Sequence, residues 1–95
     1  MIDDEDIRAL REEIDSIDVE LIRLYAKRME FIIEVGKIKK RKNIPIEDKE
    51  RSAEVLKHVA EEAKKHGLDE KKVVEFWKNF IECAIKEQEG ITTED

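Results

Sequence analysis

The sequence predicts an all-α chain with three helices, of which the first is very long. Charged residues make up 46% of the chain and aromatic residues only 5%, with three glycines and one proline. This composition is typical of helical domains and not of sheet proteins or disordered chains. Two series with a seven-residue spacing fill the first half of the chain, and nine of their ten members are apolar: Ile7, Ile14, Leu21, Arg28, Val35 and Leu10, Ile17, Leu24, Phe31, Ile38.

The first helix is expected over about residues 5–42. No Gly or Pro interrupts residues 6–35, and Gly36 is followed by further apolar periodicity and helix-favouring Lys and Arg. The helix should stop at Asn43-Ile44-Pro45, because the residue before a proline avoids the helical region.

Two shorter helices are expected over about residues 49–65 and 70–89. Asp48 and Asp69 are good N-caps for them, and Gly67 suits a left-handed residue after the first of the two. The last helix should end before Gly90, and we expect residues 91–95 to be frayed. The whole chain, 1–95, is predicted to be a single helical domain.

The length of the first helix predicts a dimer. Some 37 helical residues span about 55 Å, whereas a compact globule of this size has a diameter of about 32 Å. The apolar seam nevertheless continues to Ile38, so a second copy should bury the overhang in a twofold homodimer.

Composition also limits the partners and the location. A net charge of −6 disfavours nucleic acid and anionic membranes as partners. No apolar run approaches the ~20 residues that span a bilayer, and the acidic N-terminus argues against a secretion signal. The single Cys83 excludes an internal disulfide and fits the cytoplasm. With no second catalytic domain in the sequence, we expect a monofunctional chain unless it associates with another enzyme.

Arg28 is the one charged member of the apolar seam. A guanidinium cannot lose its charge, and burying it unpaired is costly, so it needs an anionic partner. A ligand with carboxylate or phosphate groups is the simplest one. Lys39 lies about 20° and about 16 Å away on the same helix face. Arg11 is about 42 Å from Lys39 and could reach that pocket only from the other subunit of an antiparallel dimer; alternatively it forms a surface ion pair.

Other polar residues allow two interpretations each. Gln88 projects into an apolar stripe of the third helix, either as a frayed end in solvent or as an amide that donates to a ligand. The second helix begins with three polar residues on the face that continues with apolar side chains: Asp48, Arg51 and Ser52. They either contribute to a site, or Asp48 is a cap bridged to Arg51. The basic run at residues 37–42 fits a solvated helix C-terminus, or part of it faces an anion.

Several kinds of chemistry are not supported. His58 and His66 have no third ligand at a zinc-binding spacing, so we expect no metal. No Ser, Cys or His stands beside a recognisable base, and no Gly-rich loop cradles a nucleotide. Fixed cations and one amide remain. Such a set can hold a small dianion and stabilise developing negative charge without a cofactor.

The chain resembles the all-helical chorismate mutases of the AroQ class over about residues 7–89. The resemblance rests on six pieces in order: Leu10-Arg11-Glu12-Glu13-Ile14-Asp15-Ser16-Ile17-Asp18, Lys27-Arg28, Val35-Gly36-Lys37-Ile38-Lys39, Pro45-Ile46, Asp48 with Arg51, and Gln88. It implies an intertwined helical homodimer with two sites, each built from both subunits.

The resemblance also implies residue roles in the rearrangement of chorismate to prephenate, a step of aromatic amino-acid biosynthesis in the shikimate pathway. Arg28 and the partner's Arg11 would clamp the two carboxylates. Lys39 and Gln88 would donate to the ether oxygen, where charge grows. Asp48 would contact the ring hydroxyl region, and Arg51 would support the carboxylate end.

Two positions depart from the mutase pattern. Ser52 stands where the mutases usually have a Glu that binds the ring hydroxyl, and Ala84 stands where a Ser is common. Isochorismate pyruvate lyases share the fold and the cationic set and also lack that Glu. The sequence therefore leaves open a lyase, or a non-catalytic dimer or regulatory domain, beside the mutase.

Overall fold

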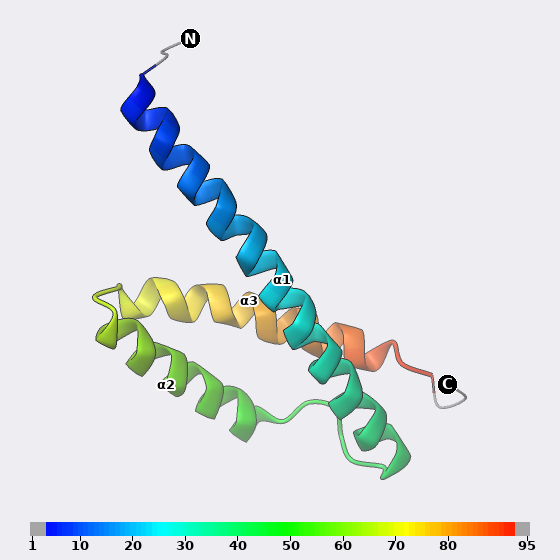
Figure 1. Ribbon diagram of the computed structural model, residues 1–95. Coiled ribbons are helices and arrows are strands. Elements are labelled where there is room, and N and C mark those ends of the chain that lie inside the picture. Colours follow the sequence, from blue (N-terminus) through cyan, green and yellow to red (C-terminus); the bar gives the residue numbers. More distant parts are fainter. Residues whose placement is uncertain (1–3, 93–95) are drawn as a thin grey trace. The chain divides into compact units, whose positions relative to one another are not determined.

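The computed structural model describes residues 4–92 and contains three helices, α1 (Glu5–Arg41), α2 (Lys49–Lys65) and α3 (Glu70–Glu89) (Figure 1). The described residues include no strand, so the all-α prediction is confirmed. Over the same residues, no helix combines the length and the apolar character that crossing a bilayer requires. The chain forms two compact units, the first ending at Phe31 and the second beginning at Ile32.

The first unit is the N-terminal part of α1. The Asp4 carboxylate accepts hydrogen bonds from the backbone N–H groups of Asp6 (2.9 Å) and Ile7 (3.1 Å), which satisfies two donors at the helix start. The apolar seam of this unit is exposed to solvent in the single chain, with more than half of each side chain accessible at Leu10, Ile14, Ile17, Leu21, Leu24 and Phe31. A helix with such a stripe needs an apolar partner surface.

The second unit consists of the last turns of α1 together with α2 and α3, and α2 packs against α3. Trp77 and Phe80 meet edge to face, with ring centroids 5.1 Å apart. The buried apolar side chains among the described residues are Val59, Ala63 and Ala84, and no large side chain is fully buried. A single chain therefore buries little apolar surface for its size.

The end of α1 differs slightly from the prediction. The helix ends at Arg41, because Asn43 adopts a left-handed conformation with φ 57°. The backbone N–H groups of Asn43 and Ile44 then turn back to the carbonyls of Lys40 (3.4 Å) and Lys39 (2.8 Å). This pattern satisfies two carbonyls that the helix end leaves open.

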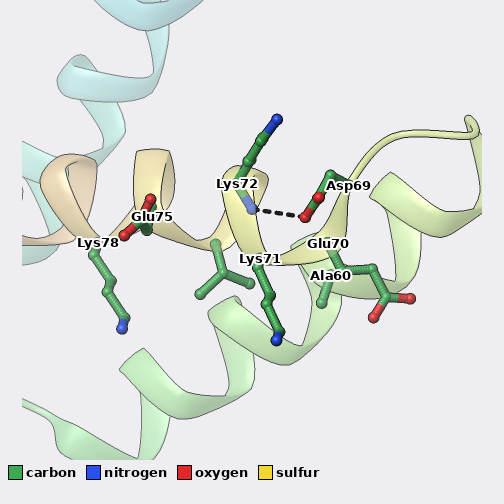
Figure 2. Close-up of a pocket in the computed structure, with 8 residues that line it drawn as sticks. Ala60, Asp69, Glu70, Lys71, Lys72, Glu75 and Lys78 are labelled. Carbon is green, nitrogen blue, oxygen red and sulfur yellow. Dashed lines mark hydrogen bonds between the residues drawn. The ribbon is translucent and has the colours of Figure 1, made fainter.

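The caps of α2 and α3 are confirmed. Asp48 accepts from the Arg51 backbone N–H at 2.9 Å, and Asp69 accepts from that of Lys72 at 3.2 Å, the bond drawn in Figure 2. Gly67 is left-handed with φ 70°. Each helix begins where a carboxylate can bind otherwise unpaired N–H groups, and α2 ends where glycine permits the turn.

Candidate functional site

Gln88 lies in the last turn of α3 and is buried against α1 within the second unit. Its side chain is only 5% exposed, and its Nε2 donates a hydrogen bond of 2.8 Å to the backbone carbonyl of Ile32 on α1. The interpretation of Gln88 as a frayed helix end in solvent is therefore wrong. Because the Ile32 carbonyl can only accept, the amide nitrogen faces α1, and one further amide N–H and the amide oxygen remain available.

Gly36 permits this close approach of α3 to α1. It is buried, and a Cβ at this position would lie 2.7 Å from Cδ1 of Ile91, 2.8 Å from Cγ of Gln88 and 3.1 Å from its Cβ. These distances are shorter than normal van der Waals contacts. Only glycine lets the last turn of α3 sit this close to α1.

We expect Gly36→Ala to destabilise the protein even though Ala is the better helix former. The gain in helix propensity, about 1 kcal/mol, is smaller than the cost of displacing Gln88 and Ile91, typically about 1–3 kcal/mol for overpacking. Gly90→Ala is the matched control, because a Cβ there meets only backbone oxygens at 3.6 and 3.7 Å. Thermal unfolding should show a lower Tm for Gly36→Ala and an unchanged Tm for Gly90→Ala. An unchanged Tm for Gly36→Ala would contradict the close approach of α3 to α1.

Two lysines at the end of α1 bind backbone carbonyls. Lys39 Nζ donates to the carbonyl of Ile46 at 2.9 Å, and Lys40 Nζ donates to the carbonyls of Glu89, at 2.9 Å, and Ile91. This part of the basic run is thus not a purely solvated helix end. Ile91 is half-buried, so the prediction of a frayed tail is wrong for Ile91, while residues 93–95 lie outside the described part of the chain.

The start of α2 contains three further predicted site residues. The interpretation of Asp48 as a cap is confirmed, because it accepts from the backbone N–H of Arg51, but the bridge does not involve the Arg51 side chain, whose guanidinium pairs with Glu54. The Arg51 and Glu54 side chains are both exposed, so the Arg51 guanidinium forms a surface ion pair with Glu54 and not with Asp48. Ser52 is half-buried. On α3, Ala84 is 7% exposed and adds no polar group.

The two predicted arginines lie in the first unit. Arg11 is exposed. Nη1 of Arg28 is buried, and among the described residues it has no hydrogen-bond partner. A buried guanidinium N–H without an acceptor fits the prediction that an external anion completes its environment. That the two arginines join Lys39 and Gln88 in one pocket remains a prediction.

Other surfaces of the second unit offer weaker sites. An open depression beside the start of α3 (Figure 2) is lined by three lysines and three carboxylates, so it presents no dominant charge to a ligand. Its lining is Ala60, Asp69, Glu70, Lys71, Lys72, Val74, Glu75 and Lys78. Over residues 4–92, no group of three or more His, Cys, Asp or Glu side chains could hold a metal ion.

Sequence reasoning missed Ile32, Gly36 and Lys40 as neighbours of Gln88. Their spacing of four residues, which puts them on one face of α1, was the available signal. Ile32 contributes a backbone carbonyl, Gly36 the absence of a side chain, and Lys40 an ammonium group. Because these groups are chemically different, their common role becomes clear only from the position of α3.

The comparisons agree on one family. Residues 10–89 match the family described as chorismate mutase type II. A chorismate mutase of Methanocaldococcus jannaschii is 31% identical over 78 residues, which cover 82% of this chain and 79% of that protein. The T-protein of Haemophilus influenzae is 39% identical over 77 residues, covering 81% of this chain and 20% of that protein.

A third relative is the bifunctional chorismate mutase/prephenate dehydratase of Escherichia coli K12, 31% identical over 91 residues. These cover 96% of this chain but 24% of that protein, so the chain spans a quarter or less of the two longer relatives. The family match begins in the second turn of α1, covers α2 and α3 and includes each predicted site residue. The chain belongs to the chorismate mutase type II family.

Proposed function

We propose that this chain is an isomerase that rearranges chorismate to prephenate in aromatic amino-acid biosynthesis. The observation that carries the proposal is the burial of Gln88, a polar side chain held against α1 inside a very small core. Burying an amide costs free energy unless its groups are bound, and the remaining N–H suits a ligand oxygen. Membership of the family supplies the ligand.

The reaction needs little from the protein besides geometry and charge. One C–O bond of the ether breaks while one C–C bond forms within the same molecule, and no proton or electron is exchanged with the enzyme. Catalysis then consists of holding the folded conformer and stabilising the charge that develops on the ether oxygen. No cofactor is required for either task.

Lys39 and Gln88 are suited to that second task. In the free chain, Lys39 uses one N–H of its ammonium for Ile46, and Gln88 uses one N–H of its amide for Ile32. Each bond fixes the side chain and leaves at least one further donor, two for the ammonium and one for the amide. Donors that are oriented before the substrate binds need no reorganisation in the transition state.

The substrate's carboxylates would be bound by Arg28 and by the partner subunit's Arg11. Two observations support a homodimer with shared sites: the apolar seam of α1 is exposed along residues 7–31, and the buried Nη1 of Arg28 lacks an acceptor among the described residues. Pairing of the long helices in two copies would cover the seam. Asp48 and Ser52 would lie near the ring hydroxyl, where Ser52 is shorter than the usual Glu and so binds more weakly, and Arg51 would support the carboxylate end. A cytoplasmic location is supported by the composition.

Product identification tests the proposal. Purified protein is supplied with chorismate and isochorismate in separate reactions, and we expect prephenate from chorismate. A Gln88→Ala preparation, purified identically, controls for a contaminating mutase from the expression host. Pyruvate and salicylate from isochorismate, without prephenate, would show a lyase; no product from either substrate would indicate a non-catalytic dimer.

A further inference from the structure

Three positions on one face of α1 hold the last turn of α3. Ile32, Gly36 and Lys40 are spaced by four residues, so they follow each other along α1 with a rise of about 6 Å per step. The Ile32 carbonyl accepts from Gln88, and Gly36 gives room to Gln88 and Ile91. Lys40 completes the row with its bonds to the carbonyls of Glu89 and Ile91.

Lys40 binds groups that the helix itself cannot satisfy. The last carbonyls of a helix have no intrahelical donor, and they form the negative end of the helix dipole. The Lys40 ammonium supplies both a donor and a positive charge to two of the carbonyls that follow Gln88. Its sequence neighbours Lys39 and Arg41 do not share this role, since Lys39 binds Ile46 and Arg41 is exposed.

The carbonyl of Glu89 immediately follows Gln88 in the chain, so fixing it restrains the backbone from which the Gln88 side chain extends. We propose that Lys40 is a positioning residue, which anchors the last turn of α3 on α1 and thereby aims the Gln88 amide. Its effect on the reaction rate rests on the proposed function, whereas its effect on Gln88 does not.

The first test observes Gln88 directly. Amide spectra of the ¹⁵N-labelled protein contain the side-chain NH₂ signals of Gln88, which are assigned by their loss in Gln88→Ala. Lys40→Met keeps much of the aliphatic stem but removes the donor; it should shift these signals and accelerate their exchange with water, because the turn opens more often. Lys42→Met, which removes the same charge from an exposed residue just past α1, should leave the signals unchanged. Unchanged signals in Lys40→Met would overturn the proposal.

The second test measures kinetics. Lys40→Met should lower kcat roughly 10- to 100-fold, the scale of a small misplacement of a catalytic group, with little change in KM because the carboxylate clamps are intact. Lys40→Arg, which keeps a cationic donor, should recover most of the rate. In a Gln88→Ala background, Lys40→Met should lower kcat no further, because its effect passes through Gln88.

The outcomes separate the two proposals. A further fall in kcat in the Gln88→Ala background, equal to that in the wild type, would assign Lys40 a general structural role and overturn the inference. If the wild type does not convert chorismate, the proposed function fails and the Gln88 signals alone decide the role of Lys40. If Lys40→Met does not fold, Lys40→Gln replaces it with the same expected directions, and unchanged Gln88 signals would again overturn the proposal.

Discussion

Gln88→Glu should be nearly inactive at pH 8 and should regain activity as the pH falls. The native amide donates at every pH, whereas a carboxyl donates only when protonated. An ionised carboxylate would repel the charge that develops on the ether oxygen, and the loss of one oriented donor typically costs about 10²–10³ in rate. The pH profile of kcat for both proteins, measured with chorismate, checks this.

The surroundings of Gln88 set the direction of the pKa shift. The position is buried and faces the Ile32 carbonyl, so the charged form of the introduced carboxyl is disfavoured and its folded-state pKa lies above the ordinary value of about 4.3. A raised folded-state pKa gives stability that is present below the unfolded pKa and is lost as the pH rises through the folded one. The stability of Gln88→Glu relative to the wild type should therefore fall over the same range as its activity.

Glu87→Gln is the matched control, because it makes the reverse exchange at an exposed neighbouring position. We expect this variant to keep the wild-type pH profile and Tm. A flat pH profile at near-native rate for Gln88→Glu would remove Gln88 from the reaction and leave it as a structural bridge between α3 and α1.

Arg28→Ala should abolish measurable activity while the protein stays folded. Arg28 would bind a substrate carboxylate, and losing a charge-assisted contact of this kind costs about 10²-fold or more in kcat/KM. Nη1 of Arg28 is buried without a hydrogen-bond partner among the described residues, so its removal should leave the free energy of unfolding unchanged or raise it. Denaturant unfolding and initial rates measure the two effects.

Arg23→Ala is the control on the same helix. Arg23 forms an exposed ion pair with Glu20 at 2.9 Å, and such pairs contribute about 1 kcal/mol or less. Rate and stability should both remain near wild type. A strongly destabilised Arg28→Ala protein would instead mean that Arg28 has an internal acidic partner.

The local features of the fold could be predicted because their causes are local. Asp48 and Asp69 bind N–H groups three residues ahead, and Gly67 sits where the chain turns, so a short stretch of sequence determines each. Pro45 predicts where α1 should end, but Asn43 turns the chain before it. Asparagine tolerates the left-handed region better than most residues, and a helix ends where a residue adopts that conformation.

The sequence indicates which residue types a candidate site would use, but not their contacts. Gln88 interrupts an apolar stripe with a polar side chain, which marks it in the sequence, yet its acceptor is a backbone carbonyl 56 residues away. The sequence places Lys40 in a basic run that fits a solvated helix end or a surface facing an anion, and nothing in the sequence marks its carbonyl partners. Contacts to backbone groups over long separations depend on how α3 meets α1, which helical periodicity does not specify.

The central claim, that each site is built from both subunits, is tested most directly by mixing two strongly impaired variants. Arg11→Ala and Gln88→Ala are each expected to convert chorismate about 10²–10³ times more slowly than the wild type, a low but measurable rate. In a mixed dimer, one site combines the intact Gln88 of the first variant with the intact Arg11 of the second. Equal amounts of the two, unfolded and refolded together, should recover about a quarter of the wild-type rate, since half the dimers are mixed and each carries one intact site. A mixture that stays as inactive as its components would contradict the shared site.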